Sequence, residues 1–132
     1  MTLRRSLPLL SLAALVALAT PRSNSEDMMS SDAETLKALA EAGSDLRKLH
    51  LIDYWIFFQD ESGARAAAKD LVASGFFVVS LDKDPEDSEW RLLARKEMVP
   101  RLEDVEKTSA LVEALARRNN GDYDGWETQV SD

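Results

Sequence analysis

The sequence of 132 residues contains no cysteine and only one histidine, His50. Without thiols the chain cannot form disulfides, thiolate zinc sites or cysteine nucleophiles. A single imidazole offers one general base and no tetrahedral zinc site, and we expect His50 in a loop or at a strand end. No serine stands in a G-x-S-x-G context, and no glycine-rich phosphate loop occurs. The sequence therefore predicts a protein with no catalytic residues, no metal and no cofactor.

Positive charge is also scarce. Asp and Glu number 24 and Lys and Arg number 16, which gives a formal net charge of −8. Such a field repels phosphate backbones and attracts basic protein segments. We therefore expect a protein partner with a basic segment and no direct binding of nucleic acid, and the oligomeric state stays open. The hydrophobic fraction of 45% is enough for one folded domain of ordinary size.

No apolar run is long enough to predict a stable membrane span. The longest, residues 7–19, follows Arg4 and Arg5 and ends in Ala17-Leu18-Ala19, a small-x-small sequence typical of a signal peptide cleaved after Ala19. An exported, periplasmic protein is one interpretation of this segment. The alternative is a cytoplasmic protein whose translation starts at Met28 or Met29. In both cases we expect residues 1–30 to be a signal peptide or unstructured leader and residues 31–132 to be the domain.

Hydrophobic spacing predicts the first two elements of that domain. Ser31 and Glu34 form an S-x-x-E capping box before a helix over residues 32–42, which ends at Gly43. The segment 51–58 is short, aromatic and β-branched, which predicts a central strand buried on both faces.

A helix and a hairpin are predicted next. Asp60 is the expected N-cap of an alanine-rich amphipathic helix that stops at Gly75. Residues 76–81 and 90–96 read as two strands joined by an acidic loop, with alternate side chains of the second strand on one face.

The last two elements are a long helix and a strand. We expect Pro100 at the first position of the helix, which closes at Asn119-Asn120-Gly121. Residues 123–130 then form the final strand. The order, a helix followed by βαββαβ, predicts an α+β ferredoxin-like sandwich in which two helices cover one face of a four-stranded antiparallel sheet. The position of the extra N-terminal helix is not predicted.

Aromatic residues of the first strand supply one candidate binding surface. Its two sets of alternating side chains are Leu51, Trp55 and Phe57 on one side and Ile52, Tyr54, Ile56 and Phe58 on the other. Because two helices cover only one sheet face, one set must point away from them, and Arg91, Leu93 and Arg95 are expected to border it. This face is either a docking surface, or it is covered by the N-terminal helix or by a second copy of the chain.

Clustered carboxylates supply the second candidate. The loop of the hairpin carries Asp82, Asp84, Glu86, Asp87 and Glu89. Acids near the start of the long helix are explained by the helix dipole, but no such local explanation applies to the loop. We expect the loop to steer a basic partner segment.

The sequence G-D-Y-D-G-W at residues 121–126 is the third notable feature. Gly121 suits a helix C-cap, Gly125 within a strand predicts a bulge, and Trp126 is expected in the core under the long helix. Asp122 and Asp124 lie two residues apart on one side of a strand. They form either a partner-binding or metal-binding pair, or simply the solvated edge of the sheet.

Three segments together resemble the RraB family, the regulators of ribonuclease E activity B. They are GSDLRK after the first helix, EMVP before the long helix and GDYDGWE on the last strand, and the resemblance spans residues 35–130. It implies a ferredoxin-like fold and a non-catalytic regulator that binds RNase E and restrains RNA processing. Two other hypotheses stay open, namely an exported cell-envelope binding or structural domain, and a small-molecule or hydrolytic site on Asp122 and Asp124.

Overall fold

The computed structural model describes residues 30–86 and 88–131. The predicted signal peptide, the alternative starts at Met28 and Met29, and Asp87 of the acidic loop lie outside the described residues. In chain order the elements are α3 (Ser31–Glu41), β1 (His50–Phe58), α4 (Glu61–Ala73), β2 (Phe77–Lys83), β3 (Trp90–Met98), α5 (Leu102–Arg118) and β4 (Gly121–Thr128).

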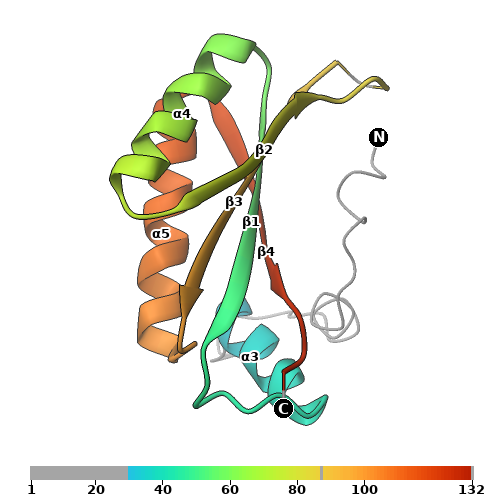
Figure 1. Cartoon of the computed structure of the whole chain (residues 1–132), viewed down its shortest axis with the longest axis vertical. Coiled ribbons are helices and arrows are strands. Elements are labelled where there is room, and N and C mark those ends of the chain that lie inside the picture. The colour runs from blue at the N-terminus through green and yellow to red at the C-terminus, as the bar shows by residue number, and fades with distance from the viewer. Residues whose placement is uncertain (1–29, 87, 132) are drawn as a thin grey trace.

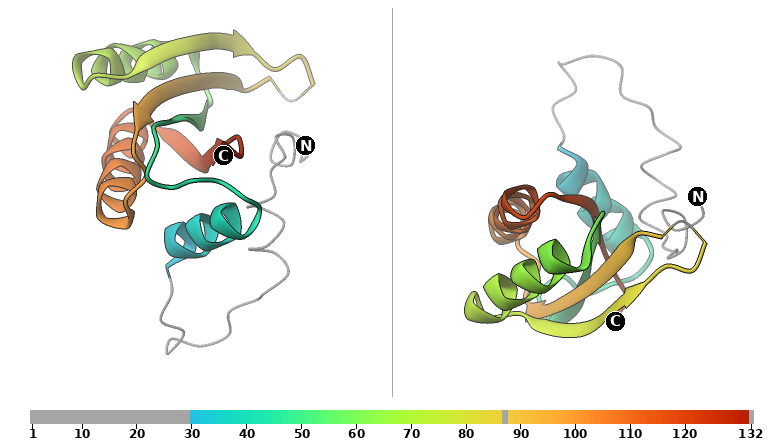
Figure 2. Two further views of the ribbon diagram at one scale, coloured as in Figure 1. Left: turned by 60° about the horizontal axis from the view of Figure 1, so that its bottom comes forward. Right: turned by 90° about the horizontal axis from the view of Figure 1, so that it is seen from above.

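The four strands form one antiparallel sheet in the order β2-β3-β1-β4, with β1 and β3 in the middle. Helix α4 packs on β2 and β3, and α5 packs on β4, so both crossover helices lie on the same side (Figure 1). The view from above in Figure 2 shows the resulting two layers. The predicted α+β ferredoxin-like sandwich is confirmed. No helix within the described residues is long and apolar enough to cross a membrane.

The core lies between the sheet and these two helices. On β1 the side chains that face the helices are Ile52, Tyr54, Ile56 and Phe58, all of them buried. Alanines of α4 and Val112, Leu115 and Ala116 of α5 pack against them. The small alanine side chains let α4 approach the sheet closely. The question of which set of β1 side chains points away from the helices is thereby settled in favour of Leu51, Trp55 and Phe57.

Helix starts were predicted to within two residues. Asp60 caps α4 as expected, since its carboxylate accepts a hydrogen bond from the Gly63 amide at 2.7 Å. For α3 the cap is Ser30 and not Ser31, because the Ser30 hydroxyl accepts from the Ala33 amide. The expected position of Pro100 was wrong, since α5 begins at Leu102 and Pro100 lies before its N-cap. Proline is compatible with the extended backbone there as well as with the first helical turn.

Of the two glycines in the last strand, Gly121 does not have the predicted role and Gly125 does. Asn120, at a φ of 62°, and not Gly121 takes the left-handed conformation after α5. Gly121 is instead the first residue of β4, where a Cβ atom would overlap the ring of the buried Phe58. Gly125 does mark a bulge, because the register between β1 and β4 shifts between Trp55 and Ile56 and Gly125 has a φ of 109°.

Helix α3 packs at the end of the helical layer and not over the opposite face of the sheet. Leu36 and Leu39 form a second, smaller core with Val105 at the start of α5. Trp126 contacts both cores and donates a hydrogen bond from its indole N–H to the Asp32 carboxylate at 2.8 Å. Trp126 is therefore half-buried at a junction and not wholly within the main core as predicted. The idea that α3 covers the second sheet face is wrong.

Candidate functional site

The sheet face opposite α4 and α5, called the outer face below, is covered by no helix among the described residues (Figures 1 and 2). Strand register assigns its side chains, which are Leu51, Asp53, Trp55, Phe57, Phe77, Ser80, Asp82, Arg91, Leu93, Arg95, Glu97, Asp122 and Glu127. Large apolar side chains are exposed on it, because Phe77 is 71% and Leu51 52% exposed. Apolar exposure of this kind on an uncovered sheet face is typical of an interaction surface.

These side chains form rows across the sheet. One row contains Phe77, Arg95, Asp53 and Glu127, and another contains Asp82, Arg91, Phe57 and Asp122. Between them Leu93 and Trp55 lie next to Gly125. The outer face is therefore an apolar and aromatic row between two charged rows.

The arginine of each charged row is paired within its row. Arg95 donates to both carboxylate oxygens of Asp53 at 2.6 and 3.1 Å, a bidentate arrangement, and hydrogen bonding to Asp53 raises the pKa of Arg95. Arg91 donates to Asp82 at 3.2 Å. Acidic side chains outnumber the arginines on this face, so its net formal charge is negative.

The β4 end of the first charged row holds a carboxylate with an altered pKa. Glu127 lies directly across from Asp53, and its Oε2 is 3.4 Å from the indole nitrogen of Trp55. The pKa of Glu127 is raised to about 7, mainly by burial; the indole hydrogen bond acts to lower it and the nearby charge of Asp53 to raise it. Like charges opposite each other on neighbouring strands are unfavourable.

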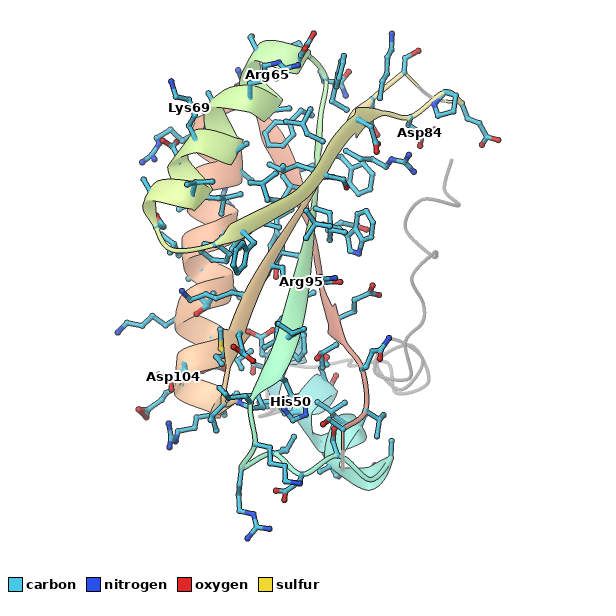
Figure 3. The ribbon with its side chains drawn as sticks, in the orientation of Figure 1. His50, Arg65, Lys69, Asp84, Arg95 and Asp104 are labelled. Carbon is cyan, nitrogen blue, oxygen red and sulfur yellow. The ribbon has the colours of Figure 1, made fainter. Side chains whose placement is uncertain are left out.

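The acidic loop between β2 and β3 is less available than the sequence suggested. Asp84 is buried, and its carboxylate accepts the backbone N–H of Glu86 at 2.9 Å. Its backbone N–H and C=O also close the turn, by bonding the Glu89 carbonyl and the Ser88 amide. Asp84 therefore shapes the loop, which projects beyond the sheet in Figure 3. Glu86 is exposed, whereas Glu89 accepts from Gln59 at 3.1 Å.

The pair Asp122 and Asp124 lies on β4, an edge strand, as the solvated-edge interpretation expects. Asp122 is exposed and Asp124 half-buried, and the bulge interrupts the strand alternation between them. Within residues 30–86 and 88–131 no three His, Asp or Glu side chains are grouped to hold a metal ion.

His50 belongs to a buried hydrogen-bonded cluster with Ser44 and Ser131, called the clasp below. It lies at the opposite end of the sheet from the acidic β2–β3 loop (Figure 3). Its Nε2 is 3.0 Å from the Ser44 hydroxyl oxygen and its Nδ1 is 2.9 Å from the Lys48 carbonyl. The same hydroxyl oxygen accepts the Ser131 amide at 2.8 Å. A serine–histidine pair can act as a nucleophile, but here both residues are buried and the hydroxyl is engaged by the backbone. The clasp holds the C-terminal segment against the loop before β1, and His50 is the strand-end residue that we expected.

Of the predicted site residues, the structure places Trp55, Phe57, Asp82 and Asp122 on the outer face, and the loop acids extend from one end of it. Phe57 is only 2% exposed, so it supports this face from below and offers a partner almost no surface. Arg91, Leu93 and Arg95 border them as predicted. Sequence reasoning missed Phe77 and Glu127. The signal for Glu127 was present, because Trp126 and Thr128 share the helix-facing side of β4 and alternation places Glu127 opposite them.

Fold and surface together define a small ferredoxin-like α+β protein with a charged and aromatic outer sheet face. Residues 30–128 match the family described as regulator of ribonuclease activity B, RraB. A protein of that name from Pseudoalteromonas atlantica is 34% identical over 98 residues, which cover 72% of this chain and 84% of the relative. The chain belongs to the RraB family, and the resemblance seen in the sequence is confirmed.

Proposed function

We propose that this protein restrains the endoribonuclease RNase E by binding it through the outer face, and that it catalyses no reaction itself. The observation that carries this proposal is the face itself, where Leu51 and Phe77 are exposed, Trp55 and Leu93 are partly exposed, and no described helix lies over them. Family membership supports a role in regulating a ribonuclease. The negative charge of the chain supports a protein partner and disfavours competition for the RNA.

The two parts of the surface have different roles in this proposal. The exposed apolar side chains supply the area that excludes water and holds the partner. The acidic loop and the charged rows speed the encounter with a basic segment and set its orientation. Asp84 maintains the loop conformation, so in this proposal the steering charge comes from Asp82, Glu86, Asp87 and Glu89.

The experiment compares glutamate substitutions at matched positions on the two sides of the molecule. Leu51→Glu places a charge on the outer face, and Val72→Glu does so on α4, where Val72 is 57% exposed against 52% for Leu51. We expect Leu51→Glu to weaken binding of purified RNase E at least about tenfold and Val72→Glu to change it less than twofold, because only the first buries a charge in the interface. Calorimetry measures affinity, and RNA cleavage by RNase E measures restraint. Equal loss in both variants, or none in either, contradicts the proposal.

A further inference from the structure

The β4 side of the outer face combines an aromatic ring, an open backbone and a carboxylate. Trp55 lies across from Gly125, and Glu127 follows two residues later on β4. A Cβ atom added at Gly125 would meet no atom within 4 Å, so the space next to this backbone position is open. The contact between the indole N–H and Glu127 is long, at 3.4 Å, which places the carboxylate at the edge of the ring without a strong bond to it.

The charges around this strip lack a matching cation among the described side chains that face it. Asp53, directly across from Glu127, is negative, and the neighbouring Arg95 is engaged by Asp53 through two hydrogen bonds. Since Arg95 balances the charge of Asp53, the carboxylate of Glu127 has no cation to balance its own charge among these groups. Burial and Asp53 hold the pKa of Glu127 near 7, which shows that ionising this carboxylate is unfavourable while no further cation is present.

We propose that the strip formed by Trp55, Gly125 and Glu127 binds one arginine side chain of the protein partner. The flat guanidinium stacks on the indole above Gly125 and donates its N–H groups to Glu127. Arginine suits this strip better than lysine, because a planar cation stacks on a ring and bonds a carboxylate with two donors at once. The inference rests on the proposed function for the identity of the partner and adds the chemistry that the partner must supply.

Binding of this kind releases a proton. The arginine needs an ionised Glu127, and below about pH 7 the free carboxylate is mostly protonated. Asp53 and Arg95 are the other charged groups that face it within the described residues. If binding of the partner's arginine lowers the pKa of Glu127 from about 7 to well below 6, the affinity for the partner at pH 6 is about tenfold lower than at pH 8.

Two measurements test the inference. The first follows the Trp55 indole N–H by NMR while N-acetylarginine amide is added, with N-acetylcitrulline amide as the neutral probe of the same shape. We expect a saturable shift with arginine only, lost in Glu127→Gln and kept in Glu97→Gln, which removes a charge from the same face at another row. The second measures RNase E affinity at pH 6 and pH 8, where the tenfold difference shrinks below about twofold in Glu127→Gln.

The outcomes separate this inference from the proposed function. Equal shifts with arginine and citrulline, or an unchanged pH dependence in Glu127→Gln, overturn the arginine site even when RNase E binds. Failure of RNase E to bind the wild type, with the arginine shift present and dependent on Glu127, overturns the proposed function and leaves the arginine site standing.

Discussion

Glu127 shows how one residue couples stability to pH. Its pKa of about 7 in the folded chain lies above the 4.5 of an unperturbed glutamate, so the folded state binds its proton more tightly than the unfolded state does. The resulting stabilisation is fully present below pH 4.5 and is lost as the pH rises through 7. Ionised at pH 8, the half-buried carboxylate opposes folding.

Glu127→Gln therefore stabilises the protein at pH 8 and leaves it unchanged near pH 4.5. After allowance for solvent screening of a half-exposed group, we expect a gain of about 1 kcal/mol at pH 8. Urea unfolding at the two pH values measures it, with Glu97→Gln as the control on the same face. A difference in unfolding free energy between wild type and Glu127→Gln that does not vary with pH would contradict a raised pKa of Glu127.

Among residues 30–86 and 88–131, the buried hydroxyl groups of Tyr54, Tyr123 and Ser109 have no hydrogen-bond partner of ordinary geometry. Burial raises the pKa of Tyr123, and the nearby Ser109 hydroxyl lowers it. Burial also raises the pKa of Tyr54. A buried polar group without a partner costs stability.

Tyr123→Phe should consequently leave stability unchanged or raise it by up to about 1 kcal/mol, since it removes a desolvated hydroxyl and keeps the ring. Thermal unfolding at pH 7 measures the change, and Tyr54→Phe is the parallel variant. A loss above about 1 kcal/mol would indicate that the hydroxyl has a strong partner, such as a bound water.

At the scale of elements, β1 and β4 are held close by a glycine. Gly121 faces the ring of Phe58, and an added Cβ would lie 2.7 Å from Cδ2 and 2.8 Å from Cζ of that ring. Gly121 is not in a left-handed conformation, so alanine is compatible with its backbone. The cost of a side chain here is purely one of space.

Gly121→Ala should therefore destabilise the protein by about 1–3 kcal/mol, the range for overpacking a buried site. In a Phe58→Leu background the smaller side chain makes room, and most of that cost should disappear. A double-mutant cycle by chemical denaturation measures this coupling. Additive effects of the two substitutions would show that the glycine is needed for another reason.

Some features of the helices are fixed by neighbouring residues in the chain, and others depend on contacts with distant residues. The cap at Asp60 and the stop at Gly75 follow from neighbouring residues, and the structure confirms both. The place of α3 depends on Leu36 and Leu39 meeting Val105 and on Trp126 reaching Asp32, contacts across more than sixty residues of chain. Helical periodicity indicates that α3 has an apolar side but not which surface covers it.

For the whole molecule, the net charge of −8 governs the encounter with a partner. We expect the association rate with RNase E to fall about tenfold between low salt and near-physiological salt, while the dissociation rate changes little. Stopped-flow mixing over a salt series measures both rates. An association rate independent of salt would exclude a basic segment as the site of first contact.

The sequence alone determined the class of the protein, the order of its elements and the two alternating sets of side chains on β1, because these follow from local propensities and from strand and helix periods. It also determined the absence of thiols and the sign of the charge. Only the tertiary structure decided which set of β1 side chains faces the helices, which acids meet which arginines and that Glu127 lies beside Asp53 and Trp55. Strand order and register arise from pairing between distant segments, and each pairing is stabilised by the whole sheet and not by its own residues.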